Sequence, residues 1–403
     1  MKGYQFEDTQ GTFHLKKAEN ISYLYFPIAG EAGLKSSFTP NLGGDAKIDQ
    51  NTFLLEPVSA ENLVNNRNSR NFWCNVKGIG SWSLTGHSAE ELSKKFTEMQ
   101  DDSEVTAGFM WQKTTRESKK YQLRGEILSF IPVDKNVEIM LVTITNTGRM
   151  AQTVTPTAAI PLYGRSADNI RDHRHVTSLL HRIETTDTGV LVTPTLSFDE
   201  RGHQVNHMTY YCVGWSGNGE KPVDFYPTAE DFVGEGGNFE RPYAIVKNAE
   251  GVKAGTKIEG LEAVGGLHFS EITLEPEEEC SYLIFTGITE DIQEIRNLSK
   301  TYTTREKVLE ELEKTKAYWQ EKVNVAYHTG DSDFNQFMHW VSFQPILRRI
   351  YGCSFLPHHD YGKGGRGWRD LWQDCLALLI MNPDGVRQML LDNFAGVRID
   401  GSN

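Results

Sequence analysis

The sequence predicts a β-then-α fold, in which a large N-terminal antiparallel β-sandwich is followed by linker helices and the first helices of a helical domain. Three observations lead to this prediction. Up to about residue 289, short β-branched and aromatic runs alternate with Gly, Asn, Asp and Pro turns. Residues 290–323 then contain no Gly or Pro, and their apolar residues recur at helical spacing. Close to the end, a run of apolar residues favours a helix that is covered on most sides.

The β-region contains several well-bounded strand candidates. They are residues 125–133, 137–146, 153–162, 190–196 and 208–215. A hairpin-like pair is expected at 267–274 and 280–286, on either side of the charged turn 275–279. Residues 137–144 are apolar on both faces, whereas a strand with one wet face alternates apolar and polar side chains. We therefore expect two large sheets, with another element packed over the outer face of one of them.

Two helical stretches follow the strands. One or two linker helices are expected in 290–323, with an apolar stripe of Val308, Leu312, Thr315 and Trp319. The next helix begins after the capping sequence 331–333 and runs to about residue 351. Its inward face is predicted to carry Phe334, Phe337 and Val341.

Two more helices are expected after a Gly- and His-rich loop at 352–367. The first runs from 368 to 381, and the second from Pro383 to about 394, where Gly396 stops it. Residues 376–381 are apolar nearly all round, and three helices are too few to bury them. We therefore expect an incomplete helical domain. The predicted division is 1–289 for the β-sandwich domain, 290–328 for the helical linker and 329–403 for the start of the helical domain.

Composition excludes several classes of partner. The formal net charge of −13 disfavours binding to nucleic acid and to anionic membranes. The 5 cysteines are odd in number and widely spaced, without a Cys-x-x-Cys pair, which favours free thiols in a reducing compartment. No apolar run approaches the length of a membrane span, and the N-terminus lacks a signal-like segment. The simplest expectation is a cytoplasmic protein, or a chain without its signal.

The residues with the clearest chemical potential lie in 364–374, where a glycine-rich loop enters a helix. They are Arg366, Arg369, Asp370, Gln373 and Asp374, together with two tryptophans. Carboxylates accept hydrogen bonds from vicinal sugar hydroxyls, guanidinium groups donate to sugar oxygens, and such charge-assisted bonds are strong. Four-residue spacing places Asp370 and Asp374 on one helix face. The pattern is typical of a sugar-binding site, but a buried Arg369–Asp374 ion pair and a capping role for Asp370 explain it equally well.

Other polar segments favour less specific interpretations. Adjacent His358 and His359, followed by Asp360, point to opposite sides of an extended chain, so a solvent-facing loop is favoured over a metal site. Arg348-Arg349 suits a helix C-terminus as well as it suits an anion. Residues 168–175 suggest a sandwich loop near a pocket. Residues 362–367 spell Gly-x-Gly-x-x-Gly, but no strand precedes them, so a dinucleotide site is not expected.

Taken together, these segments resemble the cellobiose phosphorylase-like family of inverting sugar phosphorylases, glycoside hydrolase family 94. The resemblance rests on residues 125–162, on 334–340 with Gln344, and most specifically on Gly367-Trp368-Arg369-Asp370-Leu371-Trp372-Gln373-Asp374. With Cys375-Leu376-Ala377-Leu378-Leu379, the last motif is most similar to the 1,2-β-oligoglucan phosphorylase branch. The family's architecture implies that residues 329–403 open an (α/α)6 barrel.

The resemblance also implies an activity: reversible phosphorolysis of a β-glucoside to α-glucose 1-phosphate with inversion. Arg369 and Asp374 are then the first sugar-binding residues, with Asp370, Gln373 and Arg366 behind them. The family's catalytic acid and phosphate-binding residues come later than Asn403, so this chain alone is expected to be inactive. The implied partners are a β-linked gluco-oligosaccharide, inorganic phosphate and a second copy in a homodimer, with no metal or other cofactor. A non-catalytic carbohydrate-binding fragment and an inverting hydrolase are the alternatives.

Overall fold

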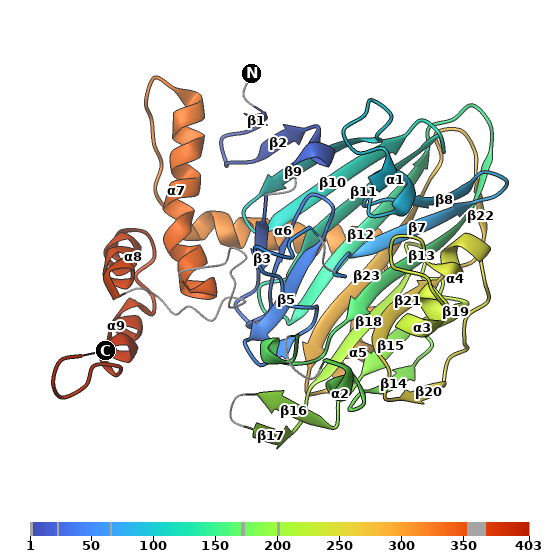
Figure 1. Cartoon of the computed structure of the whole chain (residues 1–403). Helices are drawn as coiled ribbons and strands as arrows, with labels where there is room; N and C mark the ends of the chain where they lie inside the picture. The colour runs from blue at the N-terminus through green and yellow to red at the C-terminus, as the bar shows by residue number, and fades with distance from the viewer. Residues whose placement is uncertain are drawn as a thin grey trace.

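The computed structural model describes residues 3–21, 24–64, 67–170, 174–199, 202–352 and 368–402 of the 403-residue chain. Within these ranges, every strand lies before Glu290 and the longer helices follow. Figure 1 shows the strands gathered in one body and the last helices standing at its side. The predicted order, a large antiparallel β-sandwich followed by C-terminal helices, is therefore confirmed.

The largest sheet has 11 strands, all paired antiparallel within the part of the chain that the structure describes. In spatial order these are β1 (Tyr4–Phe6), β2 (Phe13–Lys16), β9 (Asp102–Gly108), β10 (Trp111–Ser118), β11 (Leu123–Phe130), β12 (Val137–Asn146), β23 (Glu279–Thr289), β18 (Thr209–Ser216), β15 (Gly189–Val192), β14 (Arg182–Thr185) and β20 (Lys257–Glu259).

A second sheet of 6 strands packs against the first one. It contains β19 (Asp224–Thr228), β21 (Ala263–His268), β13 (Gln152–Leu162), β7 (Asn71–Val76) and β8 (Gly80–Ser83), with β22 (Ile272–Leu274) also paired to β13. Two smaller sheets are formed by β3 (Phe26–Ala29), β4 (Lys35–Phe38), β5 (Gly44–Asp49) and β6 (Thr52–Phe53), and by β16 (Leu196–Asp199) with β17 (Gly202–Val205).

The helices are of two kinds. Short ones decorate the sandwich: η1 (Ala18–Asn20), α1 (Ala89–Ser93), η2 (Ala167–Ile170), α2 (Arg174–Ser178), α3 (Ala229–Val233) and α4 (Tyr243–Lys247). Longer ones follow it: α5 (Ile292–Thr301), α6 (Arg305–Lys322), α7 (Ser332–Tyr351), α8 (Trp368–Met381) and α9 (Val386–Phe394). Among the described residues, no helix combines the length and apolar character needed to cross a membrane.

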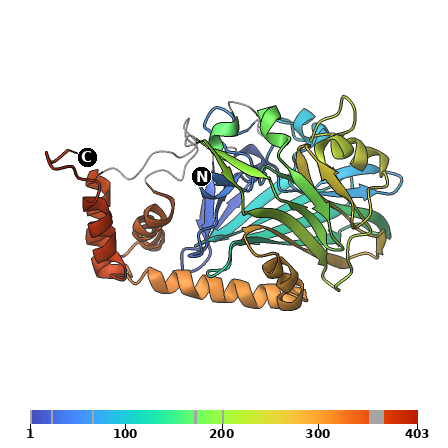
Figure 2. The ribbon, with the colours of Figure 1, turned by 90° about the horizontal axis from the view of Figure 1, so that it is seen from below.

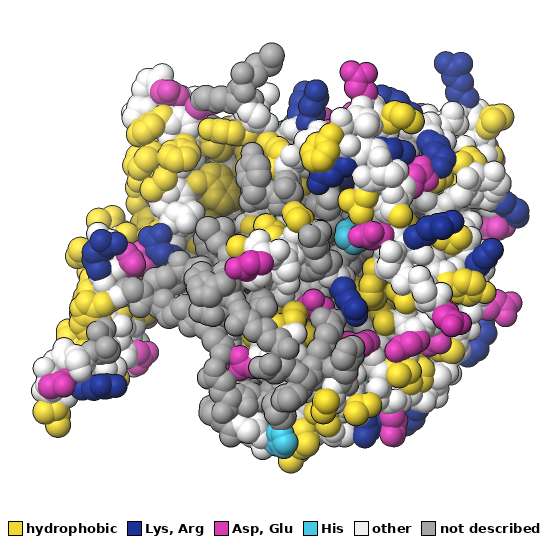
Figure 3. Space-filling model, in the orientation of Figure 1, with side chains coloured by type: hydrophobic (Ala, Val, Ile, Leu, Met, Phe, Trp, Pro, Cys, Tyr) yellow, Lys and Arg dark blue, Asp and Glu magenta, His cyan; other side chains and the backbone are white. Residues whose placement is uncertain are grey.

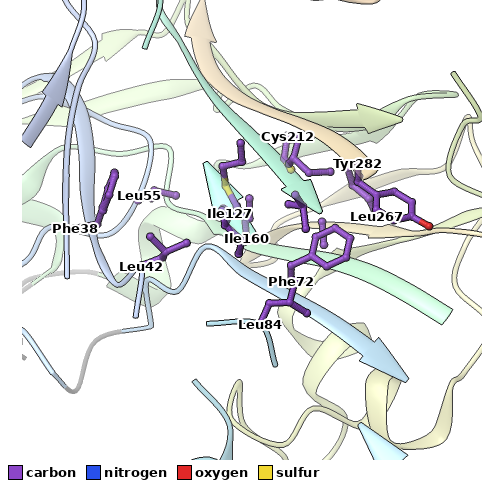
Figure 4. Packing of buried hydrophobic residues seen from close by; sticks show 14 of the residues in the cluster. Phe38, Leu42, Leu55, Phe72, Leu84, Ile127, Ile160, Cys212, Leu267 and Tyr282 are labelled. Carbon is purple, nitrogen blue, oxygen red and sulfur yellow. The ribbon is translucent and has the colours of Figure 1, made fainter. Parts of the chain in front are cut away.

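The main core lies between the 11-stranded and the 6-stranded sheets. Ile127, Cys212 and Tyr282 come from the larger sheet and meet Phe72 and Ile160 of the smaller one (Figure 4). Burial of apolar surface on this scale is the main free-energy term that favours the folded sandwich. The sequence pattern supplies it because alternate residues of each strand point to the same face.

The outer face of the 11-stranded sheet is also buried, as the two-sided apolar pattern predicted. All residues of β12 are buried, and Ile139 and Phe285 on the outer face pack against Leu298 of α5 and Val308 and Leu312 of α6. Figure 2 shows α6 running along the sandwich towards the last helices. Val308, Leu312, Thr315 and Trp319 are the buried residues of α6, as predicted.

The expected hairpin at 267–286 is wrong. β21 and β22 both pair with β13 in the smaller sheet, whereas β23 pairs with β12 and β18 in the larger one. The turn between β22 and β23 therefore crosses from one sheet to the other. Its backbone is bonded to Asn146, which accepts from the Glu277 amide and donates to the Glu278 carbonyl. Alternation and a polar turn predict two strands, but they do not determine which strands pair.

Two predicted strands are too long. The strand expected at 125–133 ends at Phe130, two residues before Pro132, and the one expected at 190–196 ends at Val192, two residues before Pro194. A proline has no N–H to donate to a neighbouring strand, and it also restricts the residue before it. Both strands therefore stop where the backbone pairing can no longer continue.

The predicted inward face of α7 is also wrong. Asp331 caps the helix as expected, accepting a hydrogen bond from the Phe334 amide. However, Phe334, Phe337 and Val341 are exposed, and the face buried against the sandwich and α8 instead carries Phe343, Ile346 and Leu347. The helix has apolar residues on two faces, and spacing alone does not determine which face meets the neighbouring elements.

The last two helices agree only in part with the expectation. α8 has the predicted bounds, but α9 begins at Val386 rather than at Pro383. Gly385 has a φ of 77°, a left-handed conformation that interrupts any helix starting before it. The Val386 amide donates to the Pro383 carbonyl, which closes a turn between the two helices.

Candidate functional site

The sugar-motif residues that the structure describes lie on the first two turns of α8. Arg369 is exposed, with 83% of its side chain accessible, and its Nη2 donates to Oδ1 of Asp370 over 3.3 Å. Gln373 is also exposed, whereas Asp370 is partly buried. Arg366 lies outside the described residues. Arg369, Asp370 and Gln373 therefore offer donors and acceptors to a molecule that approaches the start of α8.

Asp374 is in a different environment, because only 1% of it is exposed. Its partner is Arg348 in the last turn of α7, whose Nε lies 2.9 and 2.8 Å from the two carboxylate oxygens. Arg348 Nη2 also donates to Oδ1. The Arg369–Asp374 ion pair considered from the sequence is wrong, because Asp374 pairs with Arg348 and Arg369 pairs with Asp370. The motif is thus divided between a buried carboxylate and three accessible polar residues.

The sequence did not predict Arg348 as the partner of Asp374. The Arg348-Arg349 pair was equally compatible with a helix C-terminus and with an anion site. Arg349 binds Glu31, where Nη1 lies 3.0 Å from Oε2 and Nη2 lies 2.5 Å from Oε1. Burial opposes ionisation of Glu31, but the bonds and charge of Arg349 outweigh it and lower the pKa of this carboxyl. Arg348 and Asp374 are 26 residues apart along the chain, and a contact over this separation leaves no periodic signal in the sequence.

The last turn of α7 is also attached to the four-stranded sheet β3–β6 through hydrogen bonds to backbone carbonyls. The Tyr351 hydroxyl lies 2.7 Å from the carbonyl oxygens of both Ile28 and Ser36. Lys35 Nζ donates to the Ile350 carbonyl over 3.3 Å. Burial raises the pKa of Tyr351, so its hydroxyl keeps its proton and can act as a donor. The end of α7 is consequently fixed to β3 and β4.

The other end of α7 is attached to the N-terminal loop. Gln336 Oε1 accepts from the Gly11 amide over 3.0 Å, and Trp340 Nε1 donates to the Gly11 carbonyl over 2.7 Å. Gly11 has a φ of 84°, and a Cβ there would lie 3.2 Å from Trp340 Nε1. Phe343 stacks on Phe109 with ring centroids 4.3 Å apart. α7 is therefore held on the sandwich at both ends and in the middle.

Three aromatic rings surround the other side of the α8 start. Trp368 and Trp372 meet edge to face at 5.5 Å, and Phe394 of α9 lies 5.8 and 5.1 Å from them. Trp368 and Phe394 are 36% and 54% exposed. Rings of this kind can pack against the C–H face of a sugar or against further helices.

The other polar segments bear less on the site. His358, His359, Asp360 and the Gly-rich residues 362–367 lie outside the described residues. In the predicted loop, residues 168–170 belong to η2 and 174–175 to α2, while 171–173 are not described. The described residues contain no group of three or more His, Cys, Asp or Glu side chains that could hold a metal ion. Cys74, Cys212 and Cys280 are free thiols.

Two solved structures show a distant likeness to this chain. A bacterial glucoamylase complexed with acarbose matches at 9% identity and a TM-score of 0.39, over 97% of this chain and 58% of that one. A putative aldose 1-epimerase from Escherichia coli K12 matches at 10% identity and a TM-score of 0.34, over 66% of this chain and 98% of that one. At these scores the likeness carries no functional information.

Comparison of sequences is more specific. Cyclic β-(1,2)-glucan synthase NdvB of Rhizobium meliloti (strain 1021) is 26% identical over 194 residues, which are 47% of this chain and only 6% of that protein. The family profile described as "Glycosyl hydrolase 94, supersandwich domain" matches residues 55–305. These residues contain most of both large sheets together with α5. Because the match spans more than half of the chain, this protein belongs to the glycosyl hydrolase 94 family.

Proposed function

We propose that this chain is the N-terminal part of an inverting β-glucoside phosphorylase, which cleaves its substrate reversibly with inorganic phosphate to give α-glucose 1-phosphate. The observation that supports this most strongly is the family match over residues 55–305. The sugar motif on α8 adds to it, because Arg369, Asp370 and Gln373 are accessible at the start of that helix.

The proposal assigns different tasks to the parts of the full-length protein. Residues 329–403 open an (α/α)6 barrel. Arg369 and Asp374, with Asp370, Gln373 and Arg366 behind them, bind the glucosyl ring on its non-reducing side. An acid later in the barrel protonates the departing glycosidic oxygen. Phosphate is already an anion, so it attacks the anomeric carbon from the opposite face without a second carboxylate to activate it, in contrast to an inverting hydrolase. Donor groups are still needed to hold the phosphate near that carbon.

A β-1,2-linked glucan is the substrate we expect first. The relative matched over 47% of this chain is named as a cyclic β-(1,2)-glucan synthase, and the α8 motif is most similar to the 1,2-β-oligoglucan branch. A homodimer in the cytoplasm is the state we propose for the whole enzyme.

The direct test is to incubate the full-length protein with α-glucose 1-phosphate and a panel of β-1,2-, β-1,3- and β-1,4-linked glucosides as acceptors. We expect release of inorganic phosphate, greatest with the β-1,2 acceptor, and no release by residues 1–403 alone. Absence of release with every acceptor would exclude the phosphorylase. Cleavage of the same glucosides in phosphate-free buffer would instead indicate a hydrolase.

Substitution of Arg369 tests the site within the same assay. We expect Arg369→Met to raise the KM for the sugar roughly 10- to 100-fold, because a hydrogen bond from a charged group contributes about 1.5–3 kcal/mol. Arg387→Met is the matched control, since Arg387 is an exposed arginine of α9 outside the motif. Equal KM values for the two variants would remove Arg369 from the site.

A further inference from the structure

The contact between Arg348 and Asp374 involves both oxygens of the carboxylate. Nε reaches both oxygens, at 2.9 and 2.8 Å, and Nη2 donates to Oδ1 as well. Nε carries a single hydrogen, so two N–H groups of Arg348 together engage both carboxylate oxygens. The Asp374 side chain is only 2% exposed, whereas that of Arg348 is 32% exposed. Asp374 is thus held by a guanidinium group and faces away from solvent.

The turn that carries Arg348 is itself fixed to the sandwich. Its neighbours Arg349 and Tyr351 bind Glu31 and the carbonyl oxygens of Ile28 and Ser36. These contacts come from β3, β4 and the loop between them. They therefore fix the backbone position of Arg348 relative to the sheets. Through its contact with Asp374, Arg348 therefore fixes the position of α8 relative to the sandwich.

The geometry of α8 extends this effect to the sugar motif. Asp370 lies one turn before Asp374 on the same side of the helix, and Gln373 is its immediate neighbour. A bidentate pair resists both rotation and sliding of the helix, because each movement breaks at least one of its hydrogen bonds. We propose that Arg348 is a positioning residue, which holds Asp374 and thereby sets the place of Arg369, Asp370 and Gln373 for sugar binding. This inference rests on the proposed function.

The proposal requires a guanidinium group specifically. Its planar fork can reach both oxygens of one carboxylate, whereas a lysine presents a single ammonium group. Arg348→Lys keeps the charge and loses the fork, and Arg348→Met removes both. Arg305→Lys is the matched control: Arg305 also joins a helix to the sandwich through a carboxylate, Glu279, and its side chain is 34% exposed, but it lies far along the chain from α8.

Kinetics of the full-length phosphorylase separate positioning from simple loss of folded protein. Misplaced donors and acceptors bind the sugar less tightly, and a misplacement of about 1 Å can cost roughly a hundredfold. We therefore expect Arg348→Met to lower kcat/KM for the glucoside about a hundredfold and Arg348→Lys by less. The loss should appear in the KM for the sugar, with the KM for phosphate unchanged. Partial unfolding would lower the apparent kcat and leave both KM values as they are. Arg305→Lys should match the wild type.

Hydrogen exchange tests the same inference without any substrate. We expect Arg348→Met to speed amide exchange in 368–381 while 305–322 keeps its wild-type protection. Unchanged exchange in α8, or an unchanged sugar KM in an active enzyme, would overturn the positioning role while the proposed function stands. If amide exchange in α8 becomes faster but the full-length protein shows no phosphorolysis, Arg348 still positions α8 and the proposed function is excluded.

Discussion

Arg70 and Glu138 form an ion pair that is completely buried inside the sandwich. Arg70 Nε lies 2.5 Å from Glu138 Oε1, and Ser36 Oγ donates to the other oxygen. Arg70 Nη2 also donates to the Asp45 carbonyl over 3.1 Å. The pair thus joins β12 of the large sheet to β4 and β5 of the small N-terminal sheet. Such a pair fixes how the two sheets pack together. Its net contribution to the free energy of unfolding is small compared with the stability that is lost when one partner is removed.

Removal of Arg70 alone should therefore be costly. We expect Arg70→Met to lower the free energy of unfolding by about 3–5 kcal/mol, because Glu138 is left buried without its cation. Urea denaturation measures this directly. Lys77→Met is the control, since Lys77 and Glu271 are 69% and 51% exposed and such pairs contribute less than about 1 kcal/mol. If Arg70→Met/Glu138→Leu is no more stable than Arg70→Met, the isolated charge is not the cause.

His181 makes the fold sensitive to acid. Burial, assisted by the charge of Arg165, lowers the pKa of this fully buried side chain to about 4 from 6.5. Between about pH 4 and pH 6.5, the unfolded chain therefore binds a proton at His181 that the folded chain does not bind. Stability from this group is fully present above pH 6.5 and is lost as the pH falls towards 4, at about 1.4 kcal/mol per pH unit.

The corresponding prediction compares unfolding at pH 7 and pH 5. We expect the wild type to lose about 2 kcal/mol more than His181→Asn over this interval, because asparagine cannot take up the proton. His87, whose pKa burial also lowers, contributes to both proteins and cancels in the comparison. Identical pH dependence in the two proteins would show that His181 protonates equally well when folded.

At the scale of elements, α7, α8 and α9 expose an unusual amount of apolar surface. Phe337, Leu376 and Ile380 are 52%, 66% and 77% exposed, and Figure 3 shows hydrophobic side chains gathered on the helices beside the sandwich. Surfaces of this kind usually mark an interface. The proposed barrel would cover them with further helices.

A pair of substitutions distinguishes a covered from an uncovered face. In residues 1–403 alone, Ile380→Glu should change the free energy of unfolding by less than about 0.5 kcal/mol, as at other exposed positions. In the full-length protein the same change should destabilise by more than about 2 kcal/mol, because a charge would then be buried. Leu378→Glu should destabilise both, since Leu378 is 1% exposed. Equal, small effects of Ile380→Glu in both proteins would contradict the barrel proposal.

The sequence predicted elements better than it predicted contacts between them. The bounds of α8 and the buried stripe of α6 follow from local spacing, which side chains on one helix face must obey. The face of α7 and the partner of Asp374 depend on elements far along the chain. A single sequence contains each apolar or charged side chain but not the neighbour that it contacts, so the Arg348–Asp374 pair became visible only in the structure.

For the whole molecule, the sequence pattern predicted two layers but not their connectivity. In the large sheet β12 lies beside β23, and β2 lies beside β9, although many residues separate each pair. Pairing of this kind is set by three-dimensional packing, and alternation within a strand is the same whichever neighbour it has. The supersandwich match over residues 55–305 therefore adds information that periodicity does not contain.

Helix α6 connects the β-sandwich rigidly to the last helices. α6 is continuous over 18 residues, with Val308 and Leu312 on the large sheet and Trp319 among the last helices. Each residue of a helix adds about 100° of rotation and 1.5 Å of length. The number of residues in α6 therefore sets both the rotation and the distance of the last helices relative to the large sheet. One residue inserted between Leu312 and Trp319 would turn everything downstream by over a quarter of a circle relative to the sheets. We therefore expect homologues to vary the sequence of this segment freely on its wet side while keeping its residue count.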